Sequence, residues 1–327
     1  MITYEEEQTE NAISYANIGR EKLSDYGFFE SPLADLIPTS NVYPYELNTP
    51  LFTDYALKKR FIYIPAGAAA KYHDKEVFEF PVGTVLIKNF YYDEAQLKGK
   101  RKIVETRLLV HEENGWKALP YIWNDEQTEA SLEITGGELQ VKLNGKDEFK
   151  YAIPNMVQCK SCHELNGSIM PIGPVARQLN KIVKGNNQLT LLEEAGVLSG
   201  LPEINMIDKL AEWDNDKPGT LDERARAYLE INCGHCHRPE GPGKNSGLDL
   251  TTFSESDHAL GIYKSPVAAG AGSGGFDYDI VPGNSESSIL TFRMESSEPG
   301  IMMPELGRKL VHAEGVALIK EWINSMK

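Results

Sequence analysis

The chain has 327 residues, a length that suits two or three domains. Of these residues 41% are hydrophobic and 25% charged, a composition typical of a globular protein. No run of 18 apolar residues occurs, so the sequence predicts no membrane-spanning helix. The formal net charge of −15 argues against binding to nucleic acid, whose phosphates call for a basic surface.

An N-terminal extension, residues 1–40, precedes a region whose pattern predicts β-structure, residues 41–153. The stretch "RKIVETRLLVH" alternates between two faces, as a half-buried strand does. Asn114-Gly115 and Asn144-Gly145 each separate two alternating stretches and predict two hairpins. Several short strands joined by turns favour a β-sandwich-like domain.

Beyond this domain the pattern changes to one that predicts helices. Residues 154–215 contain "RQLNKIVKGNNQLTLLEEAGVLSGLP", which we interpret as helical with breaks at glycines. In residues 216–327, Thr220 and Glu223 form a capping box that opens a helix, and "EGVALIKEWINSM" predicts an amphipathic last helix. The predicted fold class is α+β and multidomain, with the β-sandwich-like domain followed by a mostly α-helical region.

All four cysteines lie in two copies of one pattern, 74 positions apart. The copies are "CKSCH", with Cys159, Cys162 and His163, and "CGHCH", with Cys233, Cys236 and His237. Zinc ribbons pair their knuckles over about 15–20 residues, and a thioredoxin-type pair is expected once, beside a βαβ unit. Disulfides would explain the even number of cysteines but not the two adjacent histidines.

C-x-x-C-H is the attachment signature of c-type haem. Two thiols three positions apart bond to the porphyrin vinyl groups, and the histidine that follows supplies the proximal nitrogen to iron. The sequence therefore predicts two covalently bound haems, with zinc or disulfides as the alternatives. His235, between the second pair of cysteines, is interpreted as a filler residue, and His312 is placed near the start of the last helix.

The distal ligand of the second haem is predicted from "PGIMMPELGR". Met303 precedes a proline that stiffens its loop, and a C-terminal helix follows, as a His/Met cytochrome requires. Met302 is the alternative ligand, and both methionines would be core residues if no haem were bound. Residues 220–327 resemble a class I cytochrome c domain.

The distal ligand of the first haem is left open. The candidates are Met206, His73, His111 and Met170, or an open sixth position. The "GP" after "CKSCH" lies where class I cytochromes place a proline whose carbonyl orients the proximal histidine. If Pro174 has that role, Met170 lies on the proximal side and cannot also be the distal ligand.

Taken together, these motifs resemble a family of periplasmic diheme c-type cytochromes of Gram-negative bacteria. The stretches that carry the resemblance span most of the chain. They are "YELNTPLFTDYALKKRFIYIP", "FPVGTVLIKNF", "IPNMVQCKSCH", "PIGPVARQLN", "RARAYLEINCGHCHRPEGP" and "MMPELGRKLVHAEGVALIKEWI". The resemblance implies export and electron transfer.

Haem attachment outside the bacterial cytoplasm leads us to expect a periplasmic protein. The acidic start "MITYEEEQTE" has no signal-peptide features, which we interpret as a mature form whose signal peptide, or lipoprotein anchor, has been removed. We expect a redox protein as partner, a dehydrogenase or another cytochrome, that presents a basic patch to this acidic chain.

Three functions are considered. The first is an electron carrier without catalytic residues of its own. The second is a peroxidase-like or oxidase-like enzyme with an open first haem. The third is a β-domain binding module in which Trp116, Tyr121 and Trp123 line a site, although aromatic residues in a hairpin are more often core residues.

Overall fold

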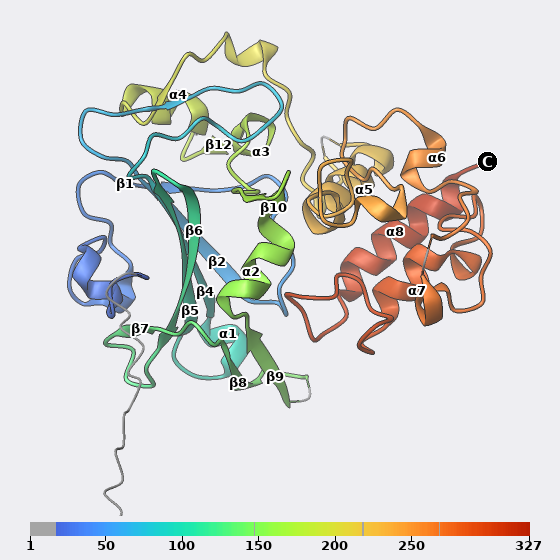
Figure 1. Ribbon diagram of the computed structural model, residues 1–327, viewed down its shortest axis with the longest axis horizontal. Coiled ribbons are helices and arrows are strands. Elements are labelled where there is room, and N and C mark those ends of the chain that lie inside the picture. The colour runs from blue at the N-terminus through green and yellow to red at the C-terminus, as the bar shows by residue number, and fades with distance from the viewer. Residues whose placement is uncertain (1–17, 147, 218, 268) are drawn as a thin grey trace, which may run out of the picture.

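The computed structural model describes residues 18–146, 148–217, 219–267 and 269–327. Its largest element is a six-stranded antiparallel sheet with the order β1-β2-β4-β5-β6-β7 (Figure 1). The strands are β1 (Val42–Tyr45), β2 (Leu57–Tyr63), β4 (Val85–Tyr92), β5 (Lys102–Glu112), β6 (Gly115–Trp123) and β7 (Ala130–Leu132). Strands that follow one another in the chain are therefore mostly neighbours in the sheet, which makes it a meander.

Both predicted hairpins are confirmed. In the first, β5 pairs with β6 up to Glu112 and Gly115. In the second, β8 (Gly137–Lys142) pairs with β9 (Glu148–Ile153) in a separate two-stranded sheet. Gly115 and Gly145 both have positive φ, which glycine adopts without steric cost, and this explains why the two Asn-Gly pairs marked the turns.

The two faces of the sheet are covered differently. The N-terminal segment, with the 3-10 helices Leu23–Tyr26 and Leu33–Asp35, buries Leu23, Phe28 and Leu36 against one face. The other face carries two apolar clusters at its ends. One cluster is formed with β1 and with the segment that follows the first C-x-x-C-H motif. The other is formed with the β8–β9 hairpin. Helix α2 (Met156–His163) lies beside the sheet, to the right of its strands in Figure 1, and faces it across a cavity.

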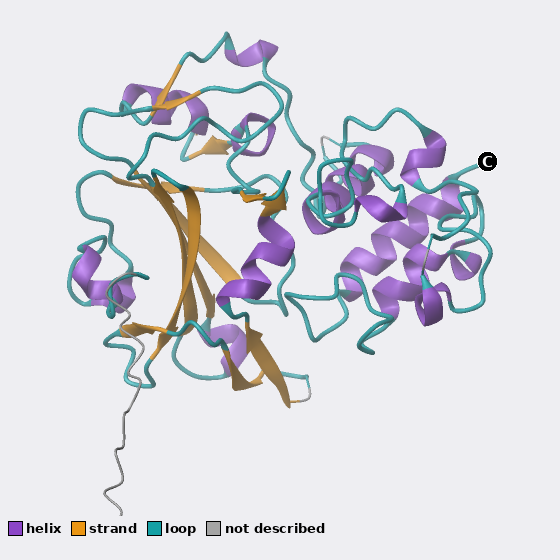
Figure 2. Cartoon of the chain, viewed as in Figure 1, coloured by secondary structure: helices purple, strands orange, loops and turns teal. Residues whose placement is uncertain are grey.

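The remaining elements are short. The other helices are α1 (Glu94–Leu97), α3 (Ala176–Leu179), α4 (Gln188–Glu194), α5 (Leu221–Leu229), α6 (Asp257–Leu260), α7 (Ile289–Glu295) and α8 (Ala313–Ser325). The other strands have two residues each and are β3 (Ala70–Lys71), β10 (Glu164–Leu165), β11 (Ser168–Ile169), β12 (Ile182–Val183), β13 (Asn186–Asn187) and β14 (Leu198–Ser199). Loops connect most of them (Figure 2).

The predicted fold class is wrong. Among the described residues, the dominant element is the large antiparallel sheet rather than a β-sandwich, and the region after it is not mostly α-helical. In the stretch predicted to be helical, α3 ends after four residues and a small hairpin, β12–β13, follows it. The physical reason is the pair Lys184 and Gly185, which both adopt positive φ and so form the turn of that hairpin.

The C-terminal part matches two local predictions. Thr220 and Glu223 form the capping box that starts α5, and α8 covers the predicted last helix, with His312 at its N-cap. The two helices approach closely where Gly315 of α8 faces Tyr228 of α5. Any side chain at position 315 would collide with the tyrosine ring, so the close packing requires glycine there. Their apolar residues form a separate core that includes Leu229, Ile319 and Trp322.

In the part of the chain that the structure describes, no helix combines the length and the apolar character needed to cross a bilayer.

Candidate functional site

The first C-x-x-C-H motif lies on α2. Asn155 and Gln158 form a capping box that starts this helix, and the motif fills its last turns. Cys159 and Cys162, three positions apart, both line one large cavity in front of the sheet, and so does His163. Both thiols are free. Helix α2 therefore presents the two sulfur atoms and the imidazole of "CKSCH" to the same space.

The imidazole of His163 is fixed by one hydrogen bond. Its Nδ1 lies 2.8 Å from the carbonyl oxygen of Met170, an arrangement that leaves Nε2 for a metal. The prediction that Pro174 supplies this carbonyl is wrong, because Met170 supplies it, and the carbonyl of Pro174 accepts from the amide of Phe78. Burial lowers the pKa of His163 to about 4, so the ring is neutral at neutral pH, the form that binds iron.

The second motif follows α5 through a π-helical turn, Glu230–Gly234. Cys233 is buried at the end of this turn, and burial raises the pKa of its thiol to about 12. The Nδ1 atom of His237 lies 2.9 Å from the hydroxyl oxygen of Ser246. Burial lowers the pKa of His237 to about 4, so this ring is also neutral. Each motif thus ends in a neutral histidine whose Nδ1 already has a partner.

The loop after "CGHCH" wraps tightly around the motif. A side chain at Gly241 would collide with the carbonyl oxygen of Cys236. At Gly243, a Cβ atom would lie 3.1 Å from Nδ1 of His237 and 2.9 Å from the same carbonyl oxygen. Both glycines are therefore required for this close approach.

The two motifs meet although they are far apart in the sequence. The ligand atoms of Cys162, His235 and Cys236 all lie within 4.8 Å of one another. The sulfur of Cys236 also lies 3.8 Å from the carbonyl oxygen of Ser161. The hydrogen bond between the two thiols lowers the pKa of Cys162 and raises that of Cys236. His235 is thus part of this cluster rather than a mere filler between cysteines.

The space in front of the sheet is here called the central cavity. It contains about 1560 Å³ of empty space when the part open to solvent is counted. Strands β2, β4 and β5 form one wall, "CKSCH" a second, and the C-terminal part a third through Cys233, Met303 and His312. A smaller side cavity lies behind Cys162 and His163 and is also lined by Met170 and His235.

Met303 lies on the wall of the central cavity that also carries Cys233. Its amide donates to the carbonyl of Arg293 at 3.0 Å, and its carbonyl accepts from Arg308 at 2.7 Å and 3.2 Å. The backbone of Met303 is therefore fixed on both sides of its side chain. Met302 is buried, and it is not among the described residues that line the central cavity.

The predicted ligands of the second haem are not all gathered in one place. Cys233 and Met303 face the central cavity, whereas Cys236 contacts the first motif. His237 is not among the described residues that line this cavity.

The four candidates for the distal ligand of the first haem are spread over different parts of the structure. Met206 is 74% exposed, and Nδ1 of His73 accepts from the amides of Lys75 and Glu76. His111 stacks on Trp116 with ring centres 4.5 Å apart, and Met170 lines the side cavity. None of the four is among the described residues that line the central cavity, so this ligand stays unassigned.

The aromatic residues considered for a binding module are core residues. Tyr121 and Trp123 are buried in the cluster on the N-terminal side of the sheet, and Trp116 packs against another core cluster.

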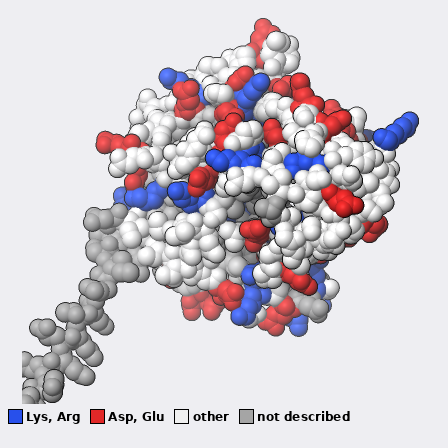
Figure 3. Space-filling model, turned by 45° about the vertical axis from the view of Figure 1, so that its right-hand side comes forward, with Lys and Arg blue, Asp and Glu red and all other residues white. Residues whose placement is uncertain are grey.

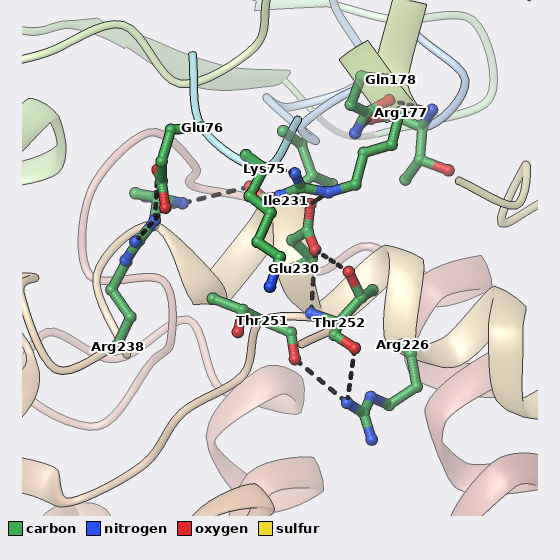
Figure 4. Close-up of polar contacts among 12 residues, drawn as sticks. Lys75, Glu76, Arg177, Gln178, Arg226, Glu230, Ile231, Arg238, Thr251 and Thr252 are labelled. Atoms are coloured by element: carbon green, nitrogen blue, oxygen red, sulfur yellow. Dashed lines mark hydrogen bonds and ion pairs between the residues drawn. The ribbon is translucent and has the colours of Figure 1, made fainter. Parts of the chain in front are cut away.

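A buried ionic network joins the segments that carry the two motifs (Figure 4). Arg177, downstream of "CKSCH", pairs with Glu230, directly upstream of "CGHCH", at 2.8 Å. The second oxygen of Glu230 accepts from the amide of Thr252 at 2.9 Å. Nearby, Arg238 pairs with Glu76 at 2.8 Å. This network fixes how the second motif lies against the first.

The first motif fits a covalent haem, because two free thiols and a neutral imidazole with an occupied Nδ1 share the central cavity. The second motif has the right donor types, but Cys236 would have to leave its contact with Cys162. Sequence reasoning missed two features: the charged groups of the cavity wall, and His312, which lines the cavity and stacks on Phe52 at 4.1 Å. Neither belongs to a recognisable motif.

Comparisons with protein-family models, with curated proteins and with solved structures gave no significant match.

Proposed function

We propose that this protein is a periplasmic c-type cytochrome that binds two haems and transfers electrons. The observation that carries the proposal is the first motif, whose two free thiols and neutral imidazole with an occupied Nδ1 all line the central cavity. C-x-x-C-H is the attachment signature of c-type haem. Two such motifs in contact would bring two redox groups close together, as electron transfer between them requires.

The chain's own residues have distinct roles in this proposal. Cys159 and Cys162 would bond to the first porphyrin, and His163 would bind its iron through Nε2. Cys233 and Cys236 would bond to the second, with His237 as proximal ligand. Met303 would be its distal ligand, favouring the ferrous state and raising the reduction potential. Each haem would supply an iron that accepts or releases one electron.

The protein's surroundings follow from the same chemistry. Haem is attached outside the cytoplasm, so we propose a periplasmic location, with or without a lipoprotein anchor. The donor or acceptor would be a redox protein with a basic docking patch.

The test is expression of the protein with a signal peptide in a bacterium that matures c-type cytochromes. We expect the intact mass of the chain plus two haems that resist denaturation, and the absorption α-band of a c-type haem after reduction. Replacing both Cys159 and Cys162 by Ala should remove one haem, and replacing Cys233 and Cys236 should remove the other. A mass without haem contradicts the proposal. Stoichiometric zinc in that sample would show that the cysteine–histidine cluster is a metal site instead.

A second candidate function is catalysis at an open first haem, of the peroxidase or oxidase type. It is favoured because none of the four predicted distal ligands is among the described residues of the central cavity. Carbon monoxide or peroxide should then change the spectrum of the reduced or oxidised protein, and the change should disappear in the Cys159→Ala/Cys162→Ala variant. Two low-spin haems that react with neither ligand would exclude this second function.

A further inference from the structure

A row of like charges crosses the sheet inside the central cavity. Arg60 on β2 is directly opposite Lys88 on β4, and Lys88 is directly opposite Arg107 on β5. Residues opposite one another on neighbouring strands point to the same face, so these three cations are neighbours. Like charges in such positions destabilise a sheet unless something offsets them. We call these three residues the basic row.

The basic row interrupts an otherwise apolar face. On β4, Leu86 precedes Lys88 and belongs to one core cluster, and Phe90 follows it and belongs to the other. All three members of the row line the central cavity together with Cys159 and His163. The cations therefore face the space in which the first motif would hold its porphyrin.

The cations of the row are incompletely neutralised by the protein. Glu105 pairs with Arg107 at 2.7 Å, but none of the described residues that line the cavity is Asp or Glu, in a chain with a net charge of −15. Arg60 is only 8% exposed, and its Nη2 has no hydrogen-bond partner. A buried polar group without a partner destabilises the fold, and a charged one does so more strongly.

Lys88 is likewise incompletely neutralised, because the neighbouring cations and burial outweigh the effect of Glu105. Burial, and then the neighbouring cations Arg60 and Lys58, hold the pKa of Lys88 well below its usual range. An anion next to the row would reverse this effect and would also give Arg60 its missing partner. The row therefore has the properties of a site for one or two carboxylates.

We propose that Arg60 and Lys88, supported by the Arg107–Glu105 pair, bind the propionate carboxylates of the haem attached to "CKSCH". This inference rests on the proposed function and extends it by assigning the sheet a role, that of holding the anionic edge of the cofactor. Guanidinium and ammonium groups are the natural partners of carboxylates, and an enclosed apolar wall strengthens such pairs. A free anion such as phosphate shares this chemistry, and the experiment separates the two.

The experiment compares Arg60→Met and Lys88→Met with Lys59→Met in the full-length haem-loaded protein. Lys59 lies next to Arg60 on β2 and is opposite Asn89, so it points to the other face and is a matched control. Intact mass should show two haems in all three variants, because thioether bonds retain the porphyrin. In the Arg60 and Lys88 variants we expect one of the two reduction potentials to fall, since a cation near iron favours the reduced state. Lys59→Met should leave both potentials unchanged.

A second measurement compares the urea midpoints of the haem-loaded and the haem-free protein, in which the same substitutions should have opposite effects. In the haem-loaded protein, Arg60→Met and Lys88→Met should lower the urea midpoint, because the propionates lose their partners. In the chain with all four cysteines replaced by Ala, the same substitutions should raise the midpoint, because they remove uncompensated buried cations. If the haem-free chain does not fold, the potentials decide alone.

The outcomes distinguish the two proposals. Two attached haems with unchanged potentials in Arg60→Met and Lys88→Met overturn the propionate site alone. The same holds if inorganic phosphate, at fixed ionic strength, stabilises the haem-loaded wild type but not these variants, because the row would then bind a free anion. Absence of haem from the wild type overturns the proposed function itself.

Discussion

At the residue scale, the position of Met303 depends on its backbone rather than on its side chain. Arg293 accepts from its amide, and Arg308 donates to its carbonyl. Arg308 also donates to the carbonyls of Met294 and Ser296, so a single guanidinium organises the whole loop. A thioether presented from such a fixed loop suits a ligand, because little conformational entropy is lost when it binds.

We therefore predict that Met303→Leu changes the second haem without unfolding the protein. Leucine keeps the apolar volume but has no sulfur, so the iron loses its distal ligand and its reduction potential falls. Absorption spectra and redox titration should show a new high-spin haem. Met302→Leu is the matched control and should behave as the wild type does. A low-spin spectrum retained in Met303→Leu would rule out this methionine as the ligand.

His312 gives the molecule a pH dependence. It stacks on Phe52, its Nδ1 lies 3.0 Å from the hydroxyl of Tyr228, and burial lowers its pKa to about 4. The charged groups around it are Glu314, Lys58 and Lys146. Above pH 7 the imidazole is neutral in both the folded and the unfolded state. As the pH falls from about 6.5 to 4, only the unfolded chain takes up the proton, so the folded state is destabilised.

We predict that His312→Gln removes this part of the pH dependence. The wild type should lose up to about 3 kcal/mol of unfolding free energy through this group between pH 6.5 and 4, and the variant should not. Urea denaturation at several pH values measures the difference between the two proteins. Parallel curves for variant and wild type across this range would show that His312 does not titrate in this way.

At the element scale, the joint between the two motif segments depends on one buried ion pair. The side chains of Arg177 and Glu230 are 9% and 10% exposed, and Glu230 lies in the π-helical turn that leads to Cys233. Removal of one member leaves the other charge buried and unpaired.

Glu230→Ala should therefore lower the free energy of unfolding by about 3–5 kcal/mol. Glu138→Ala is the control, because its pair with Lys150 is at the surface, where ion pairs contribute little to stability. Chemical denaturation measures both. Similar losses in the two variants would contradict a special role for the buried pair.

Some of the elements could be predicted from the sequence, and others could not. The Asn-Gly hairpins, α5 and α8 follow from local chemistry, namely positive φ in turns, a capping box and an amphipathic stripe. The basic row does not, because Arg60, Lys88 and Arg107 become neighbours only through the register of three strands. The contact between Cys162 and Cys236 likewise depends on tertiary packing, so the donor types were predictable but their meeting was not.

At the scale of the whole molecule, charge is distributed unevenly between the surface and the interior. The chain has a net charge of −15, yet its central cavity is lined by cations. On the face drawn in Figure 3, acidic and basic side chains are interspersed rather than gathered by sign. A redox partner at a distance would thus respond mainly to the net negative charge, whereas an anion in the cavity would respond to the basic row.

This difference predicts how salt affects electron transfer. Oxidation of the reduced protein by a small cationic cobalt complex should slow by about tenfold when ionic strength rises from 0.01 to 0.15 M, because screening removes the attraction. Oxidation by hexacyanoferrate, an anion, should accelerate over the same range. Stopped-flow absorbance at the α-band measures both rates, and the two oxidants serve as controls for each other. If the cobalt rate rises and the hexacyanoferrate rate falls instead, the net charge does not control the encounter, and a local basic surface at the haem edge does.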